Sequence, residues 1–201
     1  MEKPALTNLD INPLLKKRWS PRSFTSQKVE NDVLARIFEA ARWAPSSSNI
    51  QPWRFIVGRK GDKTWDMILE SLVDFNQKWA KLAPVLVLSV GNKISSKTNK
   101  PNKIFQYDVG QSVAYITFQV MQEGLFIHQM GGLNTEKAAK LFQVPEDYQV
   151  LTAMAIGHKG EPELLEGDFV KMEKSDRDRL TAAELVFEEA FGNSADFSAI
   201  R

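Results

Sequence analysis

The sequence predicts an α+β fold in which helices wrap a small mixed or antiparallel sheet. Helical and strand patterns both occur along the chain, without the regular alternation that marks a parallel, doubly wound sheet. No internal repeat, low-complexity tract or linker divides the 201 residues. We therefore expect one domain over residues 1–201, with its core at about residues 14–190.

The N-terminal half of the chain opens with helical signals. Asn12 and Pro13 supply an N-cap and a first helical residue. Apolar residues three and four positions apart predict two amphipathic helices further on, while aromatic, β-branched and continuously apolar runs predict strands. These predicted elements are a short helix at 14–16, helices at 31–43 and 65–75, and strands at 53–57 and 85–88.

The C-terminal half begins with a polar, lysine-rich stretch over residues 91–103, which predicts a mobile surface loop. The helix that follows has a wide apolar stripe, which predicts that it is largely buried. Gly192 supplies a helix stop near the end of the chain. The predicted elements are helices at 108–124, 135–142 and 182–191, a turn at 130–132 and a strand at 150–156.

Composition excludes several kinds of chemistry. The chain has no cysteine, which excludes disulfides, thiolate catalysis and Cys-ligated metal. Its two histidines, His128 and His158, lie far apart in the sequence and leave little material for a metal site. We expect structural or surface roles for both histidines, and we expect no metal.

Charge and hydropathy argue against nucleic-acid and membrane partners. Lys and Arg total 26 while Asp and Glu total 25, so the formal net charge is +1. The loop with Lys93, Lys97, Lys100 and Lys103 is basic, but it lacks the interleaved aromatic residues on which bases stack. The longest apolar stretch, around residues 84–90, is far shorter than the ~20 residues that span a bilayer. We expect a cytoplasmic protein.

Two arginines and a serine form the first positive signal. The chain has no G-x-G-x-x-G, P-loop, H-E-x-x-H or G-x-S-x-G motif. Arg18, Ser20 and Arg22 fall within five residues, just after the first short helix. Arginine offers a planar fork of charged donors and serine a neutral one, so together they can surround a phosphate. The alternative is a solvated basic turn.

Two further signals lie in loops. Residues 44–55 read Ala-Pro-Ser-Ser-Ser-Asn-Ile-Gln-Pro-Trp-Arg-Phe, and the amides of Asn49 and Gln51 suit the alternating donor and acceptor edge of a flat heteroaromatic ring. The alternative is a helix-to-strand loop that satisfies its own backbone. Gly131 and Gly132 allow close approach of the backbone to a ligand, or form an ordinary turn.

These three motifs, in this order and spacing, resemble the nitroreductase family of FMN-dependent oxidoreductases. The resemblance runs from Leu14 to about Phe187, and the motif at residues 44–55 is its most specific part. Asp108-x-Gly110 at the start of the central helix agrees with the family as well. The segment at 158–160 departs from it, which weakens the transfer of any particular substrate preference.

The resemblance implies an interlocked homodimer with FMN at its interface. The phosphate ligands would be Arg18, Ser20, Arg22 and Arg179, with Arg177 as the alternative to Arg179, and with Trp19 contributing its backbone alone or its backbone and ring. The residues that would approach the flavin from the partner subunit are Pro45, Ser46, Ser47 and Asn49. Gln51 would lie near the ring or the ribityl chain. The backbone N–H groups that would face flavin N5 and O4 belong to Gly131 and Gly132.

The resemblance also implies the reaction. Hydride would pass from NADH or NADPH to flavin N5, and then to a small acceptor such as a nitroaromatic, a quinone or an enone, in a ping-pong sequence. No catalytic side chain is required. Phe105 and Tyr107 flank an acceptor channel or pack at the start of the central helix. Alternatives are an FMN-binding storage or sensor protein without turnover, and a family variant that acts on flavin or on a halogenated substrate.

Overall fold

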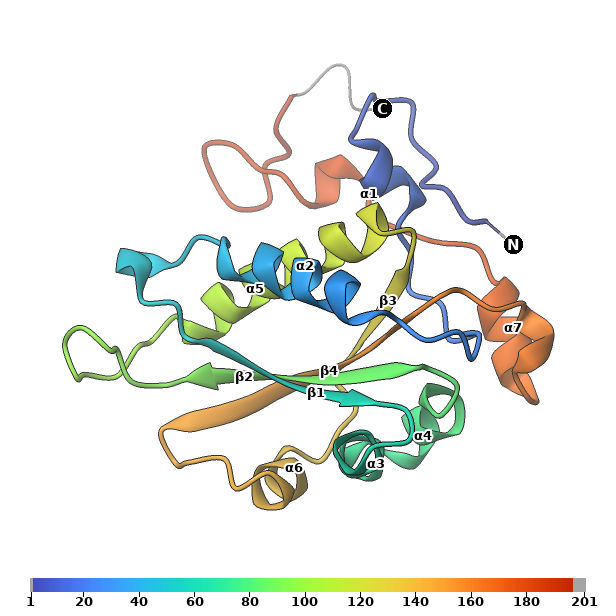
Figure 1. The fold of residues 1–201 in the computed structure, drawn as a ribbon. Coiled ribbons are helices and arrows are strands. Elements are labelled where there is room, and N and C mark those ends of the chain that lie inside the picture. The colour runs from blue at the N-terminus through green and yellow to red at the C-terminus, as the bar shows by residue number, and fades with distance from the viewer. Residues whose placement is uncertain (1, 197–201) are drawn as a thin grey trace.

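The computed structural model describes residues 2–196 and confirms the predicted α+β fold (Figure 1). Four strands form one sheet in the order β1-β2-β4-β3, and every neighbouring pair is antiparallel. No helix within residues 2–196 has the length and apolar character needed to cross a membrane. The strands are β1 (Trp53–Arg59), β2 (Val85–Asn92), β3 (Phe126–Met130) and β4 (Tyr148–Gly157).

Helices cover both faces of the sheet. Figure 1 shows α2 and α5 on one face and α3, α4 and α6 on the other. The short α1 and α7 lie outside these two layers. The helices are α1 (Pro13–Lys17), α2 (Asn31–Arg42), α3 (Lys63–Ser71), α4 (Asp74–Ala80), α5 (Phe105–Gln122), α6 (Thr135–Leu141) and α7 (Asp168–Lys174), and the 3₁₀ turns are η1 (Ser47–Asn49), η2 (Pro162–Leu164) and η3 (Ala182–Glu184).

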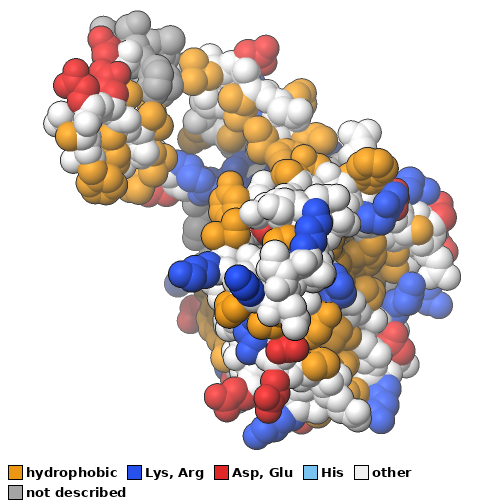
Figure 2. Space-filling model, turned by 90° about the vertical axis from the view of Figure 1, so that its left-hand side faces the viewer, with side chains coloured by type: hydrophobic (Ala, Val, Ile, Leu, Met, Phe, Trp, Pro, Cys, Tyr) orange, Lys and Arg blue, Asp and Glu red, His pale blue; other side chains and the backbone are white. Residues whose placement is uncertain are grey.

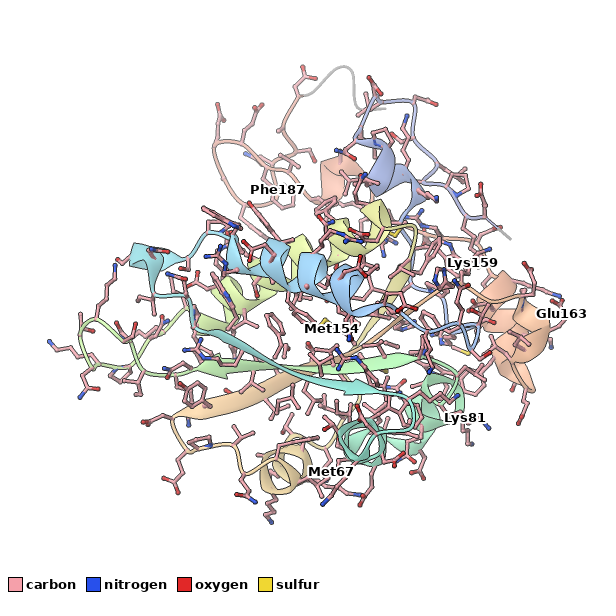
Figure 3. All side chains as sticks on the ribbon, viewed as in Figure 1. Met67, Lys81, Met154, Lys159, Glu163 and Phe187 are labelled. Atoms are coloured by element: carbon pink, nitrogen blue, oxygen red, sulfur yellow. The ribbon has the colours of Figure 1, made fainter. Side chains whose placement is uncertain are left out.

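Strand β2 is buried on both faces, as its continuous apolar run predicts. Val85 and Val87 pack into the core that contains α2 and α5, whereas Leu86 and Leu88 pack into the core under α3 and α4. Met154 of β4 is fully buried between the sheet and the α2–α5 layer (Figure 3). The two cores hold the sheet rigidly between its helices, which fixes where the strand ends point.

The single helix predicted over 65–75 is wrong, because the chain forms two helices there. Leu72 and Val73 are extended between α3 and α4. The backbone N–H of Val73 donates to the carbonyl of Gly132 at 3.1 Å, and Leu72 forms a bridge with Leu133. This pairing with the turn after β3 replaces the helical hydrogen bonds that the apolar pattern predicts.

The helix predicted over 182–191 is also wrong. Only η3 forms, and the remainder is a sequence of turns in which Gly192 has φ 97°. Phe191 is 95% exposed. A short helix depends on tertiary packing of one face, and this segment has no such packing within residues 2–196. Figure 3 shows Phe187 above the α2–α5 layer, outside the sandwiched sheet.

Two elements that the sequence patterns did not predict are important for the site. In β3, His128 and Gln129 interrupt the apolar run, so the segment does not show a strand pattern. Helix α7 has only seven residues and follows Gly167, which has φ 58°. Strand β3 leads into the Gly131–Gly132 turn, and α7 carries a buried carboxylate. The other predicted helices and strands are confirmed, with their ends displaced by a few residues, whereas the predicted loop at 91–103 begins within β2 and closes into a hairpin.

Candidate functional site

The predicted arginine segment and the C-terminal arginines line one cavity of about 270 Å³. Arg18, Ser20 and Arg22 reach it from the segment after α1, and Arg177 and Arg179 from the segment after α7. Nη1 of Arg18 donates to Oγ of Ser20 at 3.3 Å. The fold thus gathers, in one place, the basic residues that the sequence distributes over both ends of the chain.

The positive charges of neighbouring guanidinium groups in this cavity repel one another. Burial, followed by the neighbouring charges of Arg177 and Arg179, lowers the pKa of Arg18 from its ordinary value. Burial, followed by the charge of Arg179, likewise lowers the pKa of Arg177. Like charges at close range are relieved by a bound anion, so the cavity has the electrostatics of an anion site.

A buried carboxylate holds the backbone of the arginine segment. Glu173, in the last turn of α7, is 1% exposed. Its two oxygens accept the backbone N–H groups of Arg22 at 2.9 Å and of Ser23 at 3.2 Å. Such charge-assisted bonds fix the path of the loop. No sequence pattern marks Glu173, because a glutamate near lysines in a short helix resembles any solvent-facing position.

Arg22 retains a donor without a partner. Among residues 2–196, its buried Nε has no hydrogen-bond acceptor, although Glu173 lies close enough for its charge to oppose the lowering of the Arg22 pKa by burial. An unpaired buried donor costs free energy unless a ligand satisfies it. With Arg18 and Ser20 beside it, the donor set fits the oxygens of a phosphate monoester.

The arginine segment is also tied to the chain beyond β4. Oγ of Ser23 donates to the carbonyl of Glu161 at 2.6 Å, and the N–H of Gly160 donates to the carbonyl of Ser23 at 2.9 Å. A Cβ at position 160 would lie 2.6 Å from Oγ of Ser23, so this contact requires glycine.

His128 connects the arginine segment to the interior. Its Nδ1 lies 3.0 Å from the carbonyl of Pro21, and its ring packs on Trp79 with centroids 4.4 Å apart. Burial lowers the pKa of His128 to about 4, so the ring is neutral near pH 7. A neutral ring that meets a carbonyl must carry its proton on Nδ1. His128 therefore has the structural role that we expected.

The Gly131–Gly132 turn is anchored by α4. The carbonyl of Gly132 accepts Nδ2 of Asn76 at 2.9 Å, and Oδ1 of Asn76 accepts Nε1 of Trp79 at 3.3 Å. A Cβ at position 132 would lie 2.6 Å from Nδ2 of Asn76. A Cβ at position 131 would meet no described atom within 4 Å. Gly132 thus packs tightly against Asn76, whereas Gly131 faces open space.

The loop at residues 45–51 has a strained backbone and is fixed by side-chain hydrogen bonds. It contains the predicted site residues Pro45, Ser46, Ser47, Asn49 and Gln51. Ser48, Asn49 and Gln51 have φ of 50°, 52° and 53°, which is unusual for three non-glycine residues so close together. Oγ of Ser46 accepts the N–H of Gln51 at 3.0 Å. The buried carboxylate of Asp108 accepts the N–H of Ser47 at 3.3 Å. Clustered strain of this kind is typical of functional loops.

Within one chain this loop does not reach the arginine cavity. Its residues are absent from the cavity lining that the described chain provides. Figure 1 shows η1 and the arginine segment at opposite ends of α2, a helix of 12 residues, or about 18 Å. The arginine cavity and the loop at 45–51 are therefore separate regions in a single copy of the protein.

Three other predicted residues have clear surroundings. The ring of Trp19 is buried and meets Phe126 edge-on at 6.3 Å, so its contribution to the cavity is mainly its backbone. Phe105 packs against Gly91, where a Cβ would lie 2.5 Å from its ring. Tyr107 is 69% exposed at the start of α5. Of the two expected channel residues, Tyr107 is the one that is free to contact a ligand.

The lowered pKa of His128 predicts a pH-dependent contribution to stability. Above pH 6.5 the imidazole is neutral in both the folded and the unfolded chain, so its protonation takes nothing from the free energy of unfolding. Between pH 6.5 and about 4 the unfolded chain takes up the proton first, so stability falls with pH. From pH 7 to pH 4, urea unfolding should show wild type losing about 3 kcal/mol more than His128→Gln. Equal losses of unfolding free energy in both proteins would show that the folded chain does not hold His128 neutral.

Comparison with known proteins agrees with this geometry. The model of the nitroreductase family matches residues 15–158. A solved structure described as an oxidoreductase containing FMN is 33% identical, with a TM-score of 0.85 and coverage of 94% of this chain and 96% of that chain.

Two curated relatives extend the comparison. A putative NADH dehydrogenase/NAD(P)H nitroreductase of Archaeoglobus fulgidus is 25% identical over 156 residues, which cover 75% of this chain and 87% of the relative. An uncharacterized 15.4 kDa protein of Mycolicibacterium smegmatis is 26% identical over 147 residues, which cover 70% of this chain and 98% of the relative. Because the family model matches well over half of the sequence, this chain belongs to the nitroreductase family.

Proposed function

We propose that this protein is an FMN-dependent oxidoreductase that oxidises NADH or NADPH and reduces a small acceptor in two alternating half-reactions. The acceptor is a nitroaromatic, a quinone or an enone-like compound. The observation that carries the proposal is the arginine cavity, in which repelling guanidinium groups and the unpaired Nε of Arg22 fit a phosphate monoester. Family membership and the solved relative that contains FMN support it.

The phosphate end of the site uses the arginine cavity. Arg18, Ser20 and Arg22 donate to the phosphate oxygens, and Arg177 or Arg179 completes the charge balance. Nη1 of Arg177 already donates to the carbonyls of Lys3 at 2.7 Å and Lys16 at 3.3 Å. These bonds tie the N-terminal segment to the cavity, whereas Nη1 of Arg179 donates to the carbonyl of its sequence neighbour Asp178. Because that bond is local to its own segment, Arg179 is the better candidate to close on the phosphate.

The redox end of the site uses backbone donors. The turn at Gly131 faces open space, and its neighbour Gly132 is held in place by Asn76. N–H groups of this turn would stabilise negative charge that develops on the flavin ring during reduction. When bound, FMN supplies the hydride acceptor and donor, so the protein needs no side chain that acts as an acid or base. The neutral, buried His128 agrees with that division of labour.

The reaction requires two copies of the chain. The strained loop at 45–51 lies away from the arginine cavity of its own subunit, so it serves the cavity of the partner. Helix α5 has an exposed apolar stripe with Tyr107, Tyr115 and Phe118. At Gly110 a Cβ would meet no described atom within 4 Å, although glycine inside a helix costs about 1 kcal/mol relative to alanine. A stripe of this kind suits close packing against a second subunit.

The direct test is anaerobic reduction of the purified protein. We expect a yellow protein whose flavin band bleaches on addition of NADH or NADPH and recovers on addition of a quinone or nitroaromatic acceptor. A colourless protein that stays colourless after incubation with FMN would refute the proposal. Bound FMN that neither nicotinamide reduces would point instead to a storage or sensor protein.

The dimer is tested through the α5 stripe. Replacement of Tyr115 and Phe118 by aspartate places two charges on the proposed interface. We expect this variant to be monomeric at micromolar concentration and to retain far less FMN, as measured by sedimentation and by flavin absorbance. Leu6→Asp, at a position that is 90% exposed, serves as the control and should remain dimeric. A wild-type monomer with full flavin content would contradict a shared site.

A further inference from the structure

The lysine-rich segment at 93–103 is a structured hairpin. The predicted mobile loop instead has its own hydrogen bonds, in which the N–H of Ser95 donates to the carbonyl of Lys100 at 2.8 Å. Oγ of Ser95 accepts the N–H groups of Lys97 and Thr98, both at 3.3 Å. Ile94 and Pro101 form a bridge at its base. We call residues 93–103 the lysine hairpin.

The tip of the lysine hairpin carries positive charge without acidic partners. Lys97, Lys100 and Lys103 are exposed, and no ion pair within residues 2–196 includes any of them. No Asp or Glu occurs in the sequence between Asp74 and Asp108. The backbone N–H of Lys93, at the base, donates to the carbonyl of Asp147. The lysine hairpin thus presents positive charge that no ion pair within the described residues neutralises.

The tip lies directly against the strained loop. Nζ of Lys97 donates to the carbonyl of Ser48, which joins the hairpin to η1. Figure 1 shows η1 and the hairpin side by side, and Figure 2, which views that side of the molecule, shows basic side chains projecting from it. The loop at 45–51 is the part of this subunit that serves the flavin of the partner. With that role of the loop, the hairpin lies beside the flavin site of the partner.

A cationic surface beside the flavin site would favour binding of NAD(P)H. Its nicotinamide ring must reach the flavin, but the rest of the molecule carries two phosphates, and NADPH carries a third on the adenosine ribose. The chain has no G-x-G-x-x-G motif that would hold them on a helix N-terminus. The arginine cavity is already used by the FMN phosphate. Outside that cavity, the tip lysines supply positive charge beside the loop at 45–51. These lysines have no acidic partners within the described chain.

We propose that Lys97, Lys100 and Lys103 of the lysine hairpin bind the phosphate groups of NAD(P)H and favour NADPH over NADH. This inference rests on the proposed function. Lysines without acidic partners beside a binding site raise the local concentration of an anionic ligand and its association rate, and the effect weakens as salt screens the charges. Because NADPH carries the additional phosphate, it gains more from the hairpin than NADH does.

The test compares reductants of different charge on the FMN-loaded dimer. The triple variant Lys97→Gln, Lys100→Gln, Lys103→Gln removes three charges, and the side-chain amide introduced by Lys97→Gln keeps a donor near the carbonyl of Ser48. In low salt we expect the bimolecular rate of anaerobic flavin reduction to fall about tenfold with NADPH and about threefold with NADH. The rate with 1-benzyl-1,4-dihydronicotinamide, which has no phosphate, should not change. Calorimetric titration with tetrahydro-NADPH, which cannot transfer hydride, should show a comparable loss of affinity.

A second triple variant controls for net charge. Lys28→Gln, Lys63→Gln, Lys140→Gln removes three exposed lysines from other elements and should behave as wild type. Unchanged rates with NADPH in the hairpin variant, or an equal loss with the uncharged reductant, would overturn the inference. The inference would also be overturned if the hairpin variant changed only the rate with a negatively charged acceptor such as nitrobenzoate. If neither nicotinamide reduces the wild-type flavin, the proposed function itself fails, and that result is distinct from the others.

Discussion

The accumulation of guanidinium groups around one small cavity is the constraint on which the site depends. Arg18, Arg177 and Arg179 repel one another, and burial makes the repulsion stronger. The charge of Glu173 favours the charged form of Arg22, and its carboxylate fixes the backbone of the arginine segment through two N–H groups. The carboxylate shapes the cavity without filling it, because the buried Nε of Arg22 has no partner in the described chain. An anion such as the FMN phosphate completes the arrangement.

A continuous set of contacts relates this cavity to the glycine turn. The carbonyl of Pro21 meets His128, the ring of His128 packs on Trp79, and Trp79 donates to Asn76, which holds Gly132. Trp79 is fully buried, so it has little room to shift. The spacing between the arginine cavity and the glycine turn, which we propose hold the phosphate and the redox-active edge of FMN, is therefore set by the α4 side of the core. The flavin chemistry itself needs only this spacing and the backbone donors of the turn.

Sequence patterns predicted the local parts of this arrangement well. The continuous apolar run of β2 indicated burial on both faces, and the motifs at 18–24, 44–55 and 131–132 identified the loops that the structure displays at strand and helix ends. What the patterns missed depends on contacts between distant segments. Glu173 is separated from Arg22 by most of the chain, and the break between α3 and α4 exists because Val73 pairs with Gly132. The apolar residues at 182–191 resemble a helix face, but within the described chain they have no surface to cover.

The central claim is that the arginine cavity recognises a phosphate, and comparison of FMN with riboflavin tests it most directly. The two flavins share the ring and the ribityl chain and differ in the phosphate alone. Calorimetric titration of the flavin-free protein should show FMN binding at least about 100-fold more tightly than riboflavin, since two or more charge-assisted hydrogen bonds contribute about 3 kcal/mol or more. Arg18→Ala should narrow that difference, while Arg59→Ala, on β1, should not. Equal dissociation constants for FMN and riboflavin in the wild-type protein would contradict the account.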